Sequence, residues 1–282
     1  MTDRVIEAIN NGTLTADNLT HETLRDIYGD DVYGNGPEVL GRGRKIFDDT
    51  DQLDQYLYSY GKMANQQWDK PLLFTMINGD ATIIDYGCGQ GLSFLNLVCR
   101  WNDDDETWQD SLKSIILIEP SKTALNRAEA IAKLKFPDAT THTVNKKLEE
   151  LDNNDLSFDA NKVMIHIFSQ ILDIPLADNF DLIAFFENIT STIGTHYIHI
   201  VSHEVDDDNN QRNILQLYKH IVSEHVHAKV SGNTIRPVFR TPSKKPLKLI
   251  KKITNISLNT FKIQGSNKEY DCIAMFACIK TY

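Results

Sequence analysis

The chain has 282 residues, of which 41% are hydrophobic and 24% charged, and its formal net charge is −10 at pH 7. This length suits one large α/β domain, or one catalytic domain plus an N-terminal extension, and it allows a full hydrophobic core without disulfides or structural metal. No apolar run approaches the roughly 20 residues of a membrane span, and no apolar signal core follows the N-terminus. We therefore expect a cytoplasmic protein that does not contact the membrane.

The acidic charge makes nucleic acid a less favoured partner, because like charges repel phosphates within the screening length. One local exception is a lysine cluster near the C-terminus, for which a solvated surface is the simpler interpretation: Lys244, Lys245, Lys248, Lys251 and Lys252. The four cysteines form no CxxC pair, and no convincing ligand set forms around the nine histidines, so we expect reduced thiols and no metal site.

Residues 1–80 differ in character from the rest of the chain. Two or three short helices are expected there, including one near 51–60 and one near 62–77, and glycine-rich turns lie between residues 29 and 43. These features predict a helical N-terminal extension over 1–80, which would cover a second domain over 81–282.

From residue 81 onward, short apolar strands alternate with helical stretches. Strands are predicted at 82–85, 114–119, 139–144, 162–168 and 195–202, and helices at 92–101, 121–134, 178–190 and 208–223. Ser121 is a suitable N-cap for the second of these helices. Two further strands, 254–264 and 270–280, close the chain as a hairpin. This order is typical of an α/β fold with a mostly parallel sheet.

The segment 83–91 carries the strongest functional pattern. A buried strand ends in Asp85, and Gly87, Gly89 and Gly91 follow at alternate positions, with Cys88 between the first two. Glycines allow a tight turn and a close approach of ligand to backbone, and the next helix offers free N–H groups and a positive dipole end. The GxGxG spacing differs from the GxGxxG of dinucleotide-binding folds.

This pattern closely resembles motif I of the class I methyltransferases. The resemblance implies a three-layer Rossmann-like fold, with a seven-stranded, mostly parallel sheet into which the last strand inserts antiparallel. It also implies S-adenosyl-L-methionine as cofactor and S-adenosyl-L-homocysteine as product. Gly87 and Gly89 would lie under the methionine part of the cofactor, in a loop that also holds Cys88 and Gly91. Asp85 would order this loop or meet the cofactor's amino group through water.

The same resemblance places further cofactor contacts at the ends of the second, third and fourth strands. Glu119, followed by Pro120, would accept hydrogen bonds from the ribose hydroxyls. Leu148 would pack on the adenine ring, although Lys147 stands where an acidic residue is usual. Phe168 and Ser169, with the adjacent Gln170, would lie beside the cofactor.

The aromatic segment 56–68 precedes motif I and is a candidate lid or substrate wall. Its candidate residues are Tyr60, Lys62, Met63 and Trp68, of which Tyr60 and Met63 are predicted to contact the cofactor. A helix that packs its aromatic side chains on the core explains the segment equally well.

His166, in the fourth strand, is the candidate general base. A hydrogen-bonded histidine inside a strand is the alternative interpretation. The strand end lacks the Asn/Asp-Pro-Pro-Tyr/Phe motif of amino methyltransferases, and no Pro-Cys dipeptide supplies a cytosine-C5 nucleophile.

Together these features predict methyl transfer from S-adenosylmethionine to a small molecule or a protein side chain rather than to nucleic acid. Three alternatives remain open: a non-catalytic regulatory or interaction protein that binds the same cofactor, an RNA methyltransferase, and an aminopropyl transferase. The glycine spacing disfavours an NAD-dependent dehydrogenase.

Overall fold

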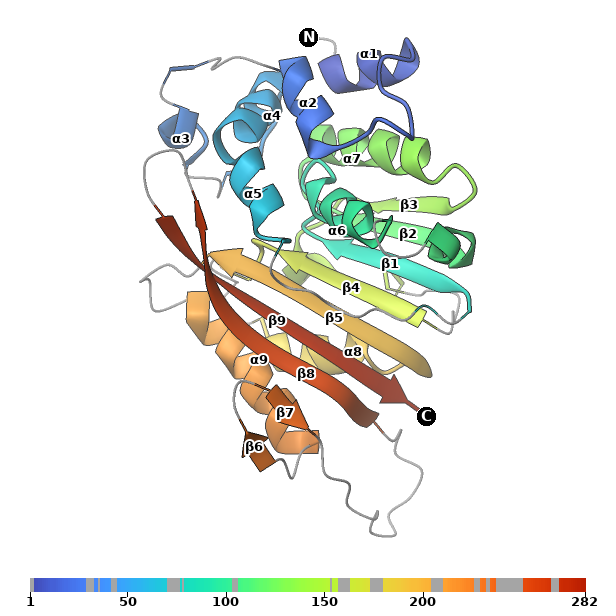
Figure 1. Cartoon of the computed structure of the whole chain (residues 1–282), viewed down its shortest axis with the longest axis vertical. Coiled ribbons are helices and arrows are strands. Elements are labelled where there is room, and N and C mark those ends of the chain that lie inside the picture. Colours follow the sequence, from blue (N-terminus) through green and yellow to red (C-terminus); the bar gives the residue numbers. More distant parts are fainter. Residues whose placement is uncertain are drawn as a thin grey trace.

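The computed structural model describes residues 3–28, 33–34, 36–41, 45–69, 77, 79–102, 106–152, 154–156, 163–172, 180–203, 210–225, 229–231, 234–236, 251–264 and 269–282. Short helices occupy the N-terminal part: α1 (Arg4–Asn10), α2 (His21–Tyr28) and α3 (Gly36–Val39) (Figure 1). Asp3 starts α1, because its carboxylate accepts hydrogen bonds from the N–H groups of Val5 and Ile6 at 2.9 and 3.1 Å.

The two helices predicted near 51–60 and 62–77 form one helical segment. Asp49 caps α4 (Thr50–Tyr56), which continues through a π-helical turn, η2 (Leu57–Gly61), into α5 (Lys62–Gln66). The segment ends at Gln66, well before the predicted end, and residues 70–76 lie outside the described part of the chain. The π turn matters for the site because it uses i→i+5 hydrogen bonds, which offset the residues after it from the preceding helical face.

In the described residues, nine strands form one sheet in the order β3-β2-β1-β4-β5-β9-β8-β7-β6. The seven longer strands are β1 (Ala81–Tyr86), β2 (Leu112–Ile118), β3 (Thr140–Val144), β4 (Val163–Ser169), β5 (Gly194–His203), β8 (Lys251–Gln264) and β9 (Glu269–Thr281). The first five strands in this order, β3, β2, β1, β4 and β5, are parallel to one another, whereas β9 runs antiparallel between β5 and β8. This order confirms the predicted class I methyltransferase fold.

The sequence did not indicate several short elements, among them the 3₁₀ turn η4 (Leu148–Glu150) after β3. Strands β6 (Lys229–Ser231) and β7 (Thr234–Arg236) extend the sheet beyond β8, and a 3₁₀ helix, η3 (Glu106–Ser111), lies in the predicted polar insertion. Three residues are too few to show the period-2 alternation by which a strand is recognised.

The helices between the strands lie close to their predicted positions. They are α6 (Leu92–Asn102), α7 (Lys122–Lys135), α8 (Leu182–Ile189) and α9 (Asn210–His225). Ser121 is the N-cap of α7, as predicted, since its hydroxyl accepts a hydrogen bond from the N–H of Ala124 at 3.1 Å. Asp181 caps α8 through the N–H of Ala184, so this helix begins later than expected.

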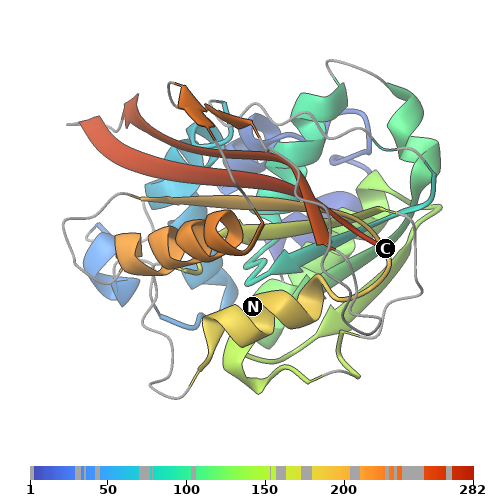
Figure 2. The same ribbon diagram turned by 90° about the horizontal axis from the view of Figure 1, so that it is seen from below.

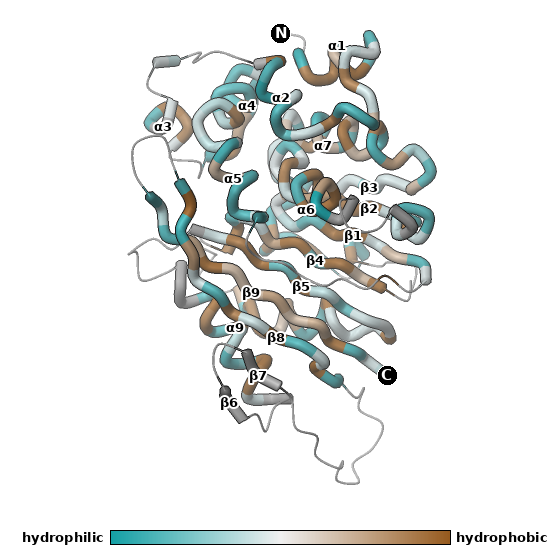
Figure 3. The backbone as a smooth tube through the Cα atoms, viewed as in Figure 1, coloured by the Kyte–Doolittle hydropathy of each residue, from teal (hydrophilic) through white to brown (hydrophobic). Residues whose placement is uncertain are grey.

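Helices cover both faces of the sheet (Figure 2), and a hydrophobic core lies on each face. The N-terminal helices, α6 and α7 cover one face, where residues such as Ile83, Ile165 and Phe276 are buried. Helices α8 and α9 cover the other face, over Ile84 and Met164. Because side chains alternate along a strand, consecutive residues enter different cores. Figure 3 shows apolar residues concentrated on the central strands, with α5 largely hydrophilic.

The N-terminal part of the chain packs against helix α7. The ammonium group of Lys135 donates to the carbonyl of Ala16 at 2.7 Å, and the hydroxyl of Thr123 donates to the carbonyl of Asp48 at 3.0 Å. These contacts join segments about 75 to 119 residues apart in sequence.

The division at residue 80 stays a prediction. Among the described helices, none is both long and apolar enough to cross a membrane.

Candidate cofactor and substrate site

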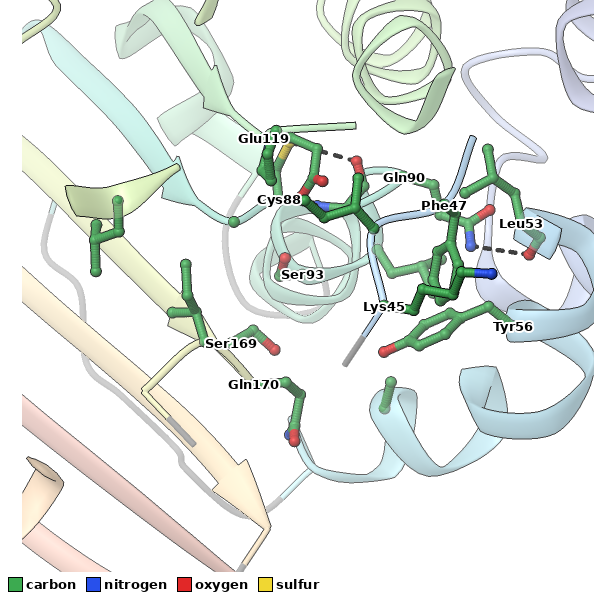
Figure 4. Close-up of a pocket in the computed structure, with 18 of the residues that line it drawn as sticks. Lys45, Phe47, Leu53, Tyr56, Cys88, Gln90, Ser93, Glu119, Ser169 and Gln170 are labelled. Carbon is green, nitrogen blue, oxygen red and sulfur yellow. Dashed lines mark hydrogen bonds between the residues drawn. The ribbon is translucent and has the colours of Figure 1, made fainter. Parts of the chain in front are cut away.

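A cavity of about 320 Å³ lies at the carboxyl ends of β1, β2 and β4. The glycine loop and the start of α6 form its floor, and the N-terminal segment forms the opposite wall (Figure 4). In parallel α/β sheets, ligands bind at this edge of the sheet. Seven of the predicted cofactor residues line the cavity: Gly87, Cys88, Gly89, Glu119, Pro120, Leu148 and Ser169.

The glycine loop takes a conformation that side chains resist. Gly87, Gly89 and Gly91 all have positive φ, at +66°, +53° and +88°. A Cβ on Gly87 would lie 2.4 Å from Ile171, and one on Gly91 would lie 3.1 Å from the Cα of Ala128. A Cβ on Gly89 would meet no atom within 4 Å. Gly89 is therefore the position where the backbone is open to a ligand, whereas Gly91 packs against α7 and supports the loop from outside the cavity wall.

Glu119 joins the end of β2 to this loop. One carboxylate oxygen accepts the N–H of Gly89 at 3.0 Å, and the other accepts the N–H of Ser121 at 2.9 Å. Burial raises the pKa of Glu119, and these two hydrogen bonds oppose the shift. A carboxylate has about four acceptor sites, so two remain for ligand hydroxyls.

Asp85 lies beneath the loop and does not reach the cavity. Its carboxylate accepts the hydroxyl of Ser93 at 2.8 Å and the N–H of Phe94 at 3.3 Å, and it is fully buried. Burial raises its pKa from 3.8 to about 7. Its Oδ1 has no hydrogen-bond partner among the described residues. These contacts fit the predicted role of ordering the loop and the first turn of α6.

The loop after β3 closes the cavity beside Glu119. Lys147, Leu148 and Glu149 line it, and the side-chain amide of Asn145 donates to the carbonyls of Glu119 and Pro120 at 2.9 and 2.7 Å. The apolar side chain expected at Leu148 is therefore held next to the strand end that carries the acid. Glu149 supplies an acidic side chain two residues after Lys147.

At the end of β4, the cavity is lined by Ser169, Gln170 and Ile171, but Phe168 is absent from its wall. Phe168 points to the α8 and α9 face, where its ring stacks on Tyr86 with centroids 4.4 Å apart. Gln170 has φ of +59°, the single positive value for a non-glycine among the described residues. The prediction for Phe168 is therefore wrong, because the alternation of the strand points it away from the cavity.

His166 points to the same face as Phe168, so the geometry contradicts its role as general base. The carbonyl of Thr192 accepts from Nε2 of His196, which leaves Nδ1 of His196 to accept from Nε2 of His166 at 3.1 Å. Nδ1 of His166 then accepts the hydroxyl of Tyr86 at 3.1 Å. Burial lowers the pKa of His166 well below its usual value. It is a neutral, hydrogen-bonded strand histidine, the alternative considered above.

The N-terminal wall includes Phe47, Leu53, Tyr56, Ala64 and Trp68. Figure 4 shows the Tyr56 ring extending from α4 toward Ser169 and Gln170. Tyr60 and Met63, which were predicted to contact the cofactor, are absent from the wall; Tyr60 instead packs on Tyr56, with ring centroids 5.2 Å apart. Trp68 is the lid candidate that the structure places at the cavity.

Sequence reasoning missed the strap 45–47 and Gln90. The strap lines the cavity because the hydroxyl of Ser121 donates to the carbonyl of Phe47. The Gln90 amide donates to the carbonyl of Leu53 at 3.1 Å and accepts from Arg127 at 2.8 Å. These contacts are long-range, and no local pattern marks them.

No protein-family model matches the sequence, and no curated protein is significantly similar to it. Among solved structures, the chain is similar to a SAM-dependent methyltransferase from Leishmania major, with 11% identity, a TM-score of 0.44, and 92% of this chain and 91% of that chain covered. A putative class I methyltransferase from Listeria monocytogenes gives 10% identity and a TM-score of 0.44, with 97% and 79% covered. A putative RNA methyltransferase from Pyrococcus horikoshii gives 12% identity and a TM-score of 0.39, with 78% of this chain and 85% of that chain covered. The strand order of this chain itself identifies the fold.

Proposed function

We propose that the chain is a cytoplasmic methyltransferase that uses S-adenosylmethionine and acts on a small molecule or a protein side chain. The observation that carries the proposal is the meeting of Glu119 with the open backbone of Gly89 inside the cavity. A carboxylate with unused acceptor sites suits ribose hydroxyls, and a backbone without Cβ suits close approach by the methionine part of the cofactor.

When bound, the cofactor supplies an activated methyl group, so the chain's main task is to bind, orient and exclude water. Glu119 would hold the ribose, and Leu148 would pack on the adenine. Tyr56, Trp68 and Ser169 would enclose the acceptor end, where a nucleophilic atom must lie in line with the transferred group. The cavity's enclosure by the N-terminal wall favours an acceptor that fits between that wall and β4.

The net charge of −10 also favours a small molecule or protein over nucleic acid. RNA is the competing acceptor. Binding of RNA that weakens steeply with rising salt, together with methyl transfer to it, would support that competitor over our proposal.

The first experiment is calorimetric titration with S-adenosylmethionine and S-adenosylhomocysteine, with NAD as the negative control. We expect micromolar binding of the first two and none of NAD. Glu119→Gln keeps the side-chain shape but loses a charged acceptor, and it should raise the Kd by roughly 10- to 100-fold, the effect of a hydrogen bond to a charged group. Glu269→Gln, on β9, is the matched control and should leave the Kd unchanged.

Transfer of a labelled methyl group then separates an enzyme from a binding protein. Label found on a small molecule or a polypeptide supports the proposal. Cofactor binding without transfer to acceptors of any class would favour the non-catalytic alternative.

A further inference from the structure

Arg127 is a buried cation that contacts three distant parts of the chain. Arg127 belongs to α7, and its side chain is 0% exposed. Its guanidinium lies 2.8 Å from the Asp3 carboxylate and 2.9 Å from the Asp54 carboxylate. It also donates to the side-chain oxygen of Gln90 at 2.8 Å. A buried charge requires such partners, because an unpaired one has a large desolvation cost. Two partners belong to the N-terminal helices, and the third belongs to the glycine loop.

Gln90 is held at both ends of its amide. The oxygen accepts from Arg127, and the nitrogen donates to the Leu53 carbonyl on α4, as the dashed line in Figure 4 shows. Gln90 stands between Gly89 and Gly91, two residues with left-handed backbone, and it lines the cavity. The amide therefore fixes the middle of the loop that Gly89 opens to a ligand.

Asp3 couples this cluster to the start of the chain. One of its oxygens caps α1, and the other pairs with Arg127. Asp54, which is 1% exposed, reaches Arg127 from α4. The cluster is complete only when both α1 and α4 are docked on α7.

We propose that Arg127 is a positioning residue that makes the cofactor-binding form of the glycine loop depend on docking of the N-terminal helices. Arg127 acts through Gln90, and Asp3 and Asp54 hold Arg127 in place. Since coupling between two equilibria is reciprocal, cofactor binding strengthens N-terminal docking to the same extent. This inference rests on the proposed function.

The test variant is Asp3→Ser, because serine still caps a helix but is too short to reach Arg127. We expect the folded variant to bind S-adenosylhomocysteine with a Kd raised roughly 5- to 150-fold, the usual range of coupling between sites. Asp181→Ser is the matched control: it alters the cap of α8 in the same way on the opposite face of the sheet, and its Kd should match the wild type.

Two measurements separate positioning from simple stabilisation. Saturating S-adenosylhomocysteine should slow hydrogen exchange in α1 and α4 of the wild type, and should slow it less in Asp3→Ser. In addition, Asp3→Ser should not raise the Kd further in a Gln90→Ala background, because the path through Gln90 is already cut. Urea denaturation confirms that each variant is folded at the titration temperature.

Each outcome decides one of the two ideas. If the wild type binds the cofactor and Asp3→Ser binds it equally well, the coupling is absent and the proposed function stands. Effects of Asp3→Ser and Gln90→Ala that multiply in the double variant overturn the path through Gln90. A wild type that binds no cofactor refutes the proposed function, and the inference falls with it.

Discussion

The two faces of the sheet bury polar groups by different means. Asp85 and Tyr86 are neighbours on β1, yet Asp85 contacts α6 on one face and Tyr86 enters the core under α8 and α9. The first face also holds the charged cluster around Arg127. The second face holds a neutral chain from Tyr86 through His166 to His196. We call the first the charged face and the second the neutral face, after these two buried clusters. The charged face supports the candidate site, and the neutral face supports the scaffold.

This difference predicts that changes on the two faces have distinct signatures. On the charged face, loss of one partner leaves another charge buried and should affect both stability and the cavity. On the neutral face, the hydrogen-bonded chain lies outside the cavity, so changes should appear in stability and its pH dependence.

The largest effect should come from Arg127→Met. Methionine retains much of the side-chain length but removes the 2.9 Å partner of the buried Asp54, which keeps only the longer 3.8 Å contact with Arg4, a change that costs about 3–5 kcal/mol. Urea denaturation at pH 7 measures the loss. Lys133→Met, on the same helix, removes a cation that is 60% exposed and should change stability by less than about 0.5 kcal/mol. If the two variants lose the same free energy of unfolding, the buried cluster around Arg127 stabilises the fold no more than an exposed ion pair does.

Asp85→Asn tests the charged face through pH. The folded pKa of Asp85, about 7, lies above its ordinary 3.8, so its contribution is fully present below about pH 4 and is lost as pH rises toward 7. The size is about 4 kcal/mol, from 1.36 kcal/mol for each pKa unit. The variant lacks this titration, so its stability should rise more steeply than that of the wild type between pH 4 and 7. Parallel stability curves would contradict the prediction.

His196→Gln tests the neutral face and should act in the opposite direction. Burial lowers the pKa of His196 from 6.5 to about 4, so its contribution is present above pH 6.5 and is lost as pH falls toward 4. Over that window the wild type should lose about 3 kcal/mol that the variant does not. Denaturation at several pH values measures this. The expected Kd for the cofactor at pH 7 is unchanged, since His196 lies outside the cavity wall.

The sequence indicates much of the fold because the relevant signals are local. The strands 82–85 and 114–119 show buried apolar runs, and Ser121 caps its helix through a residue three positions away. The glycine loop and Glu119 are recognisable for the same reason. Side chains alternate along β4, so Ser169 lines the cavity. His166 and Phe168 point to the other face, which corrects their predicted place at the site.

The N-terminal wall is not local, and its details escape the sequence. Asp3 meets Arg127 across 124 residues, and Phe47 meets Ser121 across 74. Nothing in either segment indicates the partner. Tyr56 lines the cavity where Tyr60 was expected, and Tyr60 lies inside the π turn Leu57–Gly61, which no local pattern marks.

The smallest expected difference in stability is the one between alanine variants of two glycines in the same loop. Both Gly89→Ala and Gly91→Ala place a side chain in left-handed backbone, which costs about 1–2 kcal/mol. Gly91→Ala also presses on the backbone of Ala128, which should add about 1–3 kcal/mol of overpacking, whereas Gly89→Ala points into open space. Thermal unfolding should therefore show Gly91→Ala as the less stable variant, and calorimetry should show that Gly89→Ala, though the more stable, has lost cofactor binding. A Gly89→Ala protein that binds the cofactor as the wild type does would mean that the ligand does not lie over this backbone.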